Sequence, residues 1–176
     1  MEQTVFSNLQ HDRLNNVEID GIPMNIGEEK EQLEEAVLII FEALNVECNS
    51  QDIQAIHRLP AKEGSIKPTI IQFVSRKTVT DILENRKKLK NLSQLNIEMA
   101  GLTNQSKIFI RPSLCPYYRK LAYNCRQLKR QNLITDIYTT DEGSIKIKIN
   151  SEGESIKILH EQTLLKYFPN FVGFSF

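Results

Sequence analysis

The sequence has no tryptophan, only three cysteines and no long apolar run. Because Cys48, Cys115 and Cys125 include no CxxC pair, we expect neither a disulfide framework nor a zinc site, and a reducing compartment fits best. No apolar stretch approaches the roughly 20 residues of a membrane-spanning helix, and residues 1–14 lack the apolar core of a signal peptide. We therefore expect a protein of the cytoplasm or nucleus with no membrane partner.

Signatures of common catalytic sites are also missing. The seven glycines form no GxxxxGK phosphate loop, and there is no GxSxG nucleophile motif. The three histidines are isolated, with no carboxylate at metal-ligand spacing. Cys125 stands beside Arg126, which would favour a thiolate, but no histidine is near it in sequence, and a buried inert thiol is the expected state. The sequence thus predicts no catalytic residue, no metal and no cofactor.

The net charge is zero, but the charges are separated along the chain. Residues 1–56 hold twelve acidic and two basic residues. Residues 57–134 hold four acidic and sixteen basic residues, and residues 135–176 hold six acidic and four basic residues. A neutral protein can therefore present a strongly basic surface, and such surfaces commonly face phosphate. The alternative is that the basic block pairs with the acidic first third of the chain.

Apolar spacing predicts an α+β fold. Period-two alternation and β-branched residues indicate strands, and a 3.6-residue period indicates amphipathic helices. The predicted strands are 17–23, 53–59, 69–74 and 107–111, and the predicted helices are 28–44 and a segment capped by Ser75 that ends at residue 85. This order is the ferredoxin-like βαββαβ arrangement, which the RNA-recognition motif shares.

A second, small α/β domain is predicted over residues 113–176. Its predicted elements are a helix at 117–132, a hairpin of 137–140 and 144–149, a strand at 156–159 and a helix at 161–168. Residues 1–14 are spaced like the tail of a helix but are too short to stand alone. We expect three segments: 1–14, a divergent RNA-recognition-motif-like domain at 15–112, and the C-terminal domain.

The predicted sheet lacks the aromatics on which an RNA-recognition motif stacks bases. Glu18 stands where the first-strand aromatic belongs, Pro68 and Ile70 occupy the third-strand positions, and Phe73 is expected to point into the core. Binding of nucleic acid would therefore be electrostatic and would lie elsewhere.

The best candidate is the helix after Pro116. Four of its residues are separated by four, three and four positions, which places them on one helical stripe: Arg119, Tyr123, Arg126 and Arg130. Lys120 and Lys129 flank this stripe. Arginine can bind phosphate with two donors and tyrosine can stack on a base. A solvated face that only aids solubility is the alternative.

Other cations are weaker candidates. Arg58 and Arg111 stand at strand ends, where a structural ion pair is the more common role for each. A further basic group surrounds the second predicted helix, and it too can be a solvated face. Its members are Arg76, Lys77, Arg86, Lys87, Lys88 and Lys90.

A family resemblance is carried by five segments: 15–23, 57–60, 67–76, 108–110 and 164–168. Through them, residues 9–170 resemble the first-open-reading-frame proteins of LINE retrotransposons and the baculovirus few-polyhedra protein. The resemblance implies a nucleic-acid chaperone that packages RNA and holds single-stranded RNA or DNA in a basic cleft between two domains. The cationic positions of that family would correspond to Arg58, Arg76, Arg111, Arg119 and Lys120. The family also oligomerises through a preceding coiled coil, for which residues 1–14 offer at most two heptads.

Two functions remain open at this point. The first is sequence-tolerant binding of single-stranded nucleic acid through the arginine stripe and the bases near Arg76 and Lys87. The second is a protein-interaction module in which the acidic helix of one copy meets the basic block of another. A hydrolase without a known motif is a distant third.

Overall fold

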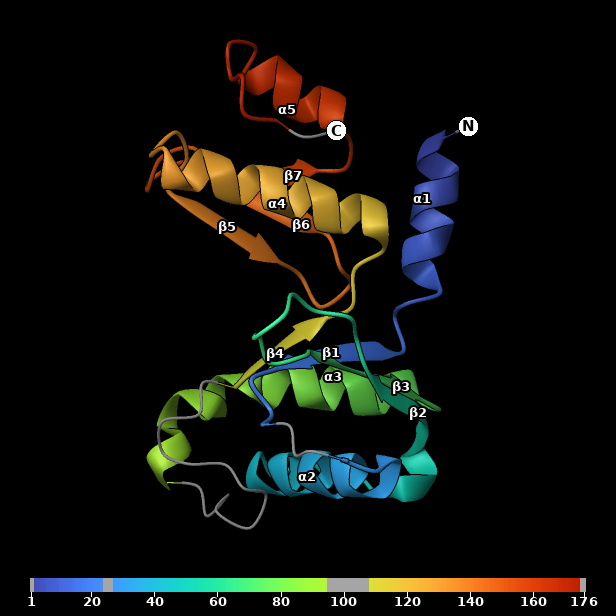
Figure 1. Ribbon diagram of the computed structural model, residues 1–176. Helices are drawn as coiled ribbons and strands as arrows, with labels where there is room; N and C mark the ends of the chain where they lie inside the picture. The colour runs from blue at the N-terminus through green and yellow to red at the C-terminus, as the bar shows by residue number, and fades with distance from the viewer. Residues whose placement is uncertain (1, 24–26, 95–107, 175–176) are drawn as a thin grey trace. The chain divides into compact units, whose positions relative to one another are not determined.

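The computed structural model describes residues 2–23, 27–94 and 108–174, and its chain divides into two compact units (Figure 1). One unit comprises Asn15–Ser113, and the other comprises Met1–Leu14 together with Leu114–Phe176. The first unit is therefore inserted in sequence between two parts of the second. Residues 1–14, predicted as a separate segment, group with the C-terminal residues. No helix among the described residues is both long and apolar enough to cross a lipid bilayer.

The inserted unit contains a four-stranded antiparallel sheet with the strand order β2-β3-β1-β4. Its elements are β1 (Asn16–Asp20), α2 (Lys30–Ala43), η1 (Ser50–Asp52), β2 (Ile53–Arg58), β3 (Thr69–Phe73), α3 (Arg76–Asn85), η2 (Arg86–Gln94) and β4 (Phe109–Pro112). The strands and α-helices follow the predicted order, and the fold is α+β. The 3-10 helix η2 was not expected. Lys107, at the start of the last predicted strand, lies outside the described residues.

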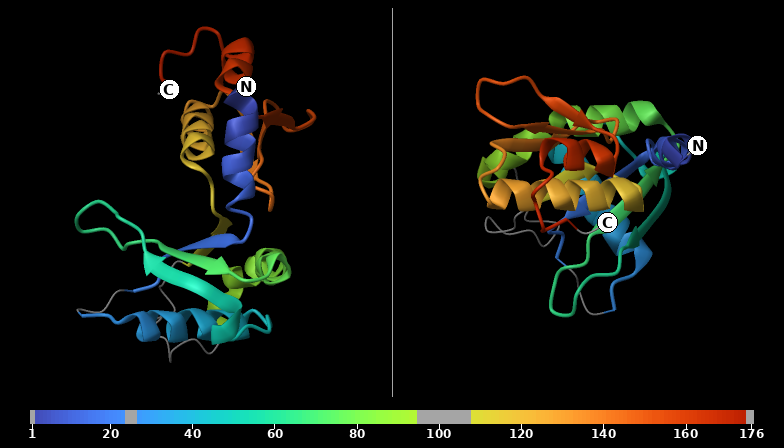
Figure 2. Two further views of the ribbon diagram at one scale, coloured as in Figure 1. Left: turned by 90° about the vertical axis from the view of Figure 1, so that its right-hand side faces the viewer. Right: turned by 90° about the horizontal axis from the view of Figure 1, so that it is seen from above.

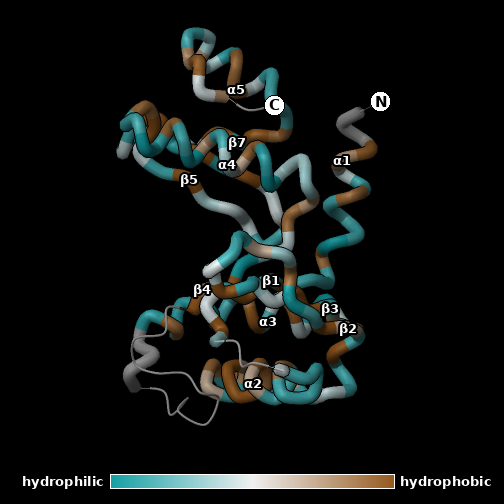
Figure 3. The backbone as a smooth tube through the Cα atoms, viewed as in Figure 1, coloured by the Kyte–Doolittle hydropathy of each residue, from teal (hydrophilic) through white to brown (hydrophobic). Residues whose placement is uncertain are grey.

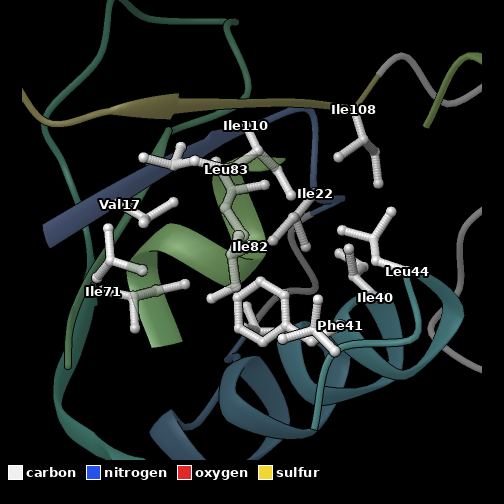
Figure 4. Close-up of a cluster of buried hydrophobic side chains, with 14 of the residues drawn as sticks. Val17, Ile22, Ile40, Phe41, Leu44, Ile71, Ile82, Leu83, Ile108 and Ile110 are labelled. Carbon is white, nitrogen blue, oxygen red and sulfur yellow. The ribbon is translucent and has the colours of Figure 1, made fainter. Parts of the chain in front are cut away.

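One face of this sheet is covered by the apolar sides of α2 and α3 (Figures 2 and 4). Alternate strand residues such as Val17, Ile19 and Ile71 point into this core. Phe73 is fully buried, as predicted, and its ring lies 5.9 Å from that of Phe41 on α2. The opposite face of the sheet carries the intervening residues.

The predicted start of α3 is confirmed. The Ser75 hydroxyl accepts a hydrogen bond from the backbone N–H of Lys77 at 3.1 Å, which satisfies one of the donors left open in the first turn of the helix. Val79, Ile82 and Leu83 form its buried side.

The second unit packs α4 (Pro116–Arg130) on a three-stranded antiparallel sheet of order β5-β6-β7. The strands are β5 (Asp136–Thr139), β6 (Ile145–Lys148) and β7 (Ile156–Ile158), and α5 (Glu161–Tyr167) follows them. Helix α4 ends two residues before the predicted end, because Asn132 adopts the left-handed backbone conformation with φ 57°.

Residues at the start of the chain form helix α1 (Glu2–His11), which tertiary contacts hold in place. The Phe6 ring stacks on Tyr117, with centroids 3.8 Å apart and planes within 3°. The buried Gln10 accepts a hydrogen bond from the backbone N–H of Cys115 at 2.9 Å. The φ of 78° at Gly143 favours glycine in this turn, and a Cβ atom there would lie 2.2 Å from the Gln10 amide nitrogen, which would then have to move.

Candidate nucleic-acid interface

Helix α4 presents a continuous basic side. Pro116 occupies the first turn, where its missing N–H has no cost, and residues such as Leu121, Cys125 and Leu128 bury the opposite side in the core. The side chains of the predicted stripe are all exposed, and Tyr123 in their midst is 47% exposed. Figure 3 shows hydrophilic and hydrophobic residues alternating along this helix. We call Arg119, Tyr123, Arg126 and Arg130 the basic face of α4.

Two lysines flank the basic face of α4. Lys120 is exposed, and the Lys129 ammonium donates to Asp136 on β5 at 2.7 Å. The guanidinium of Arg119 reaches back to the Leu114 carbonyl at 3.4 Å, which is near the limit of a hydrogen bond. No acidic residue occurs within Pro116–Arg130, so α4 carries five cations and no carboxylate of its own that would repel a phosphate.

The basic group around α3 does not form one cluster. Arg76 and Lys77 open the helix and Arg86 follows its last residue, so its ten residues separate the two sets by about 15 Å along the axis. Lys87 and Lys90 on η2 are exposed, whereas the Lys88 ammonium donates to the Leu44 carbonyl at the end of α2, at 2.8 Å. This lysine satisfies a carbonyl that the helix end leaves open.

Arg58 has a structural role. Its side chain is 11% exposed and forms a two-point ion pair with Glu28, at 2.9 Å from Nε and 2.7 Å from Nη2. The remaining N–H groups donate to the carbonyls of Ile22, Pro23 and Lys67 at 2.7 to 3.1 Å. A guanidinium has five N–H donors, and these five hydrogen bonds use all of them. No donor of Arg58 is left for a phosphate. The structure thus places this predicted binding residue in an internal network of hydrogen bonds.

Arg111 is also held by carboxylates of its own unit. It lies opposite Glu18 in the β1–β4 pairing and donates to it from Nε at 3.1 Å and from Nη2 at 2.8 Å, while Nη1 pairs with Asp20. Glu18 is only 1% exposed, and Ser113 donates to its other oxygen at 2.9 Å. The position where an RNA-recognition motif would stack a base thus holds a compensated carboxylate.

Phe109 is an exposed aromatic that the sequence reasoning missed. It lies on β4, two residues before Arg111 and on the same face of the sheet, and it is 61% exposed. The alternation of buried Ile108 and Ile110 with these two exposed residues was the available signal. The face therefore offers one aromatic ring beside a cation, on the edge strand rather than on the two central strands.

Two of the three cysteines lack the lowered pKa of a reactive thiolate. Burial raises the pKa of the Cys125 thiol to about 12, and the opposing effect of Arg126 is smaller. Burial, followed by the charges of Asp52 and Glu34, raises the pKa of Cys48 to about 11. Both remain thiols at neutral pH and are therefore poor nucleophiles and metal ligands. Within the described ranges, no three side chains of His, Cys, Asp or Glu come together as a metal site.

No protein-family model matches this chain, and a search of curated proteins finds no significant match.

Proposed function

We propose that this protein binds single-stranded nucleic acid, without strong sequence preference, through the basic face of α4. The observation that carries the proposal is the exposed row of three arginines around Tyr123 on a helix without acids. Arginine binds phosphate oxygens with two donors, and an exposed tyrosine offers a stacking surface that accepts any base.

Two further observations support this assignment. The basic block at residues 57–134 holds sixteen cations against four acids. The element order βαββαβ with strands in the order β2-β3-β1-β4 is compatible with a divergent RNA-recognition motif, as is the resemblance to LINE first-open-reading-frame proteins. On this reading the protein is a chaperone or packaging protein for RNA, with no catalytic residue and no cofactor.

The test is fluorescence anisotropy of a labelled single-stranded RNA of roughly 25 nucleotides at low and physiological salt. We expect binding that weakens steeply with salt, because each neutralised phosphate releases counterions. Double reversal of Arg119→Glu and Arg126→Glu should lower the affinity by at least about tenfold, with unchanged circular dichroism.

A matched control separates the site from net charge. Lys157→Glu with Lys166→Glu changes the charge by the same amount, and both lysines are exposed in the same unit on β7 and α5. We expect this control to retain most of the affinity. Equal losses in the two variants would show that the net charge, and not α4, governs binding, and an unchanged affinity of the α4 variant would refute the site.

A further inference from the structure

Helix α2 of the inserted unit carries an acidic face with an aliphatic centre. Four of its residues, separated by four, three and four positions in the sequence, lie on one stripe of the helix: Glu31, Glu35, Leu38 and Glu42. This stripe lies on the side of α2 away from the core residues Val37, Ile40 and Phe41. The three glutamates are exposed and Leu38 is half-buried. We call these four residues the acidic face of α2.

The acidic face of α2 borders a surface groove. The groove has a volume of about 810 Å³, and Ile39, Val46 and Cys48 contribute to its lining. It therefore combines apolar side chains with a carboxylate rim. None of the ion pairs among the described residues uses these glutamates. A partner for this surface must be cationic and must also carry an apolar or aromatic group near its centre.

The basic face of α4 has this chemistry and the same spacing. Its members follow one another at four, three and four residues, and Tyr123 is the only one without a charge. Each face extends over eleven residue steps, from its first to its last member, so each is about 17 Å long. In an antiparallel arrangement, every charge meets an opposite charge, and the tyrosine meets the leucine. The facing pairs are Glu31 with Arg130, Glu35 with Arg126, Leu38 with Tyr123, and Glu42 with Arg119.

A parallel arrangement lacks this match. It would oppose Glu35 to Tyr123 and Leu38 to Arg126, which leaves two charged groups facing uncharged ones. The sequence of the two helices thus selects one direction of pairing. Tyrosine and arginine are also residue types that are enriched in protein interfaces.

We propose that the acidic face of α2 in one copy binds the basic face of α4 in a second copy, antiparallel and in the register given above. The contact joins two different faces, so each copy can bind two neighbours, and assemblies grow with concentration unless they close into a ring. Exposed charge pairs are individually weak, so the association is reversible and sensitive to salt. Because the basic face of α4 also serves RNA in the proposed function, RNA and the second copy compete for it.

The test is sedimentation velocity of the full chain from micromolar to near-millimolar concentration. We expect the mean sedimentation coefficient to rise with concentration at about 0.1 M salt, where charges act over about 10 Å, and to stay constant at about 1 M salt, where they act over about 3 Å. Two reversal variants should each sediment as monomers: Glu35→Arg with Glu42→Arg, and Arg119→Glu with Arg126→Glu. Their equimolar mixture should regain the association, because the intact α4 of the first variant can bind the intact α2 of the second, and the reversed positions also face each other in the proposed register.

A matched control reverses two exposed acids outside the face. Glu152→Arg with Glu154→Arg gives the same change in net charge and should associate like the unmodified chain. The α2 variant should also keep its RNA affinity within about twofold, since its α4 is intact, so a failure of RNA binding is recognised separately.

Three results would overturn the proposal. The first is a monomer at every concentration at low salt. The second is a mixture that associates no better than its components. The third is a groove that binds an added arginine-rich peptide while the unmodified chain does not self-associate, because this would assign the groove to another basic partner.

Discussion

Two arginines of the inserted unit and the arginines of α4 stand in different surroundings. In the inserted unit, Arg58 and Arg111 are bound by carboxylates and carbonyls of the same unit. In the other unit, the arginines of α4 lie on the exposed side of a helix that has no acid. The charge of an arginine is the same in both places, and what differs is the low exposure of Arg58 and the presence of carboxylates paired with Arg58 and Arg111 in the same unit. The following variants test this difference, in order of decreasing effect.

Arg58→Ala should have the largest effect, on stability. It leaves the Glu28 carboxylate without its partner and removes the donors to three carbonyls. Loss of one partner from a largely buried pair costs about 3 kcal/mol or more in the free energy of unfolding, measured by urea denaturation. Arg58→Lys should recover only part of this, since an ammonium cannot form the two-point pair. A loss below about 1 kcal/mol would show that water replaces the arginine.

Arg111→Ala should destabilise the inserted unit less, by about 1–3 kcal/mol, because Ser113 still donates to the buried Glu18. Adding Glu18→Gln removes the buried charge and should restore part of the stability. Urea denaturation of the single and double variants measures this coupling. The distances indicate that Arg111 and Glu18 are coupled. If the losses of unfolding free energy in the two single variants add up to the loss in the double variant, this coupling is absent.

Tyr123→Ala should act on RNA affinity and leave the stability of the fold unchanged. Loss of one stacked base costs about 1–2 kcal/mol, or roughly a tenfold rise in Kd by fluorescence anisotropy. Tyr123→Phe keeps the ring and is the matched control, for which we expect nearly unchanged affinity. An alanine variant that binds like the unmodified chain would mean that the cations of α4 hold only the phosphates.

Lys129→Ala should have the smallest effect. The ammonium hydrogen-bonds Asp136 and, together with the backbone N–H of Ile137, holds the pKa of that carboxyl below its ordinary value. This contribution is present above the ordinary pKa of the carboxyl and is lost as the pH falls through the lowered value. As an exposed pair it adds less than about 1 kcal/mol. NMR titration should show the Asp136 pKa rising toward its ordinary value in the variant, and an unmoved pKa would assign the shift to the backbone donor.

Local patterns in the sequence were sufficient for most of the architecture. The apolar spacing of α2, the β-branched residues of β3 and the Ser75 cap each depend on neighbours within a few residues. The basic face of α4 was predictable for the same reason, because helical spacing fixes which side chains share a side.

The roles of the remaining cations were not predictable in this way. Glu28 lies 30 residues from Arg58, and Glu18 lies 93 residues from Arg111, so the charge pattern alone cannot show which arginines pair with a carboxylate. Helix α1 shows the same limit. It is too short to be stable alone, and its contacts with Tyr117 and Cys115 come from residues more than one hundred positions later.

The hydrogen bond from Cys115 to Gln10 spans 105 residues and has a consequence for synthesis. Chains leave the ribosome from the N-terminus, and domains fold as units while the chain grows. The inserted unit, Asn15–Ser113, is complete in the nascent chain before any residue of Leu114–Phe176 has emerged. Helix α1 is made before the inserted unit and acquires its stacking partner and its hydrogen-bond donor only after that unit. The unit of Met1–Leu14 and Leu114–Phe176 therefore forms after the inserted unit.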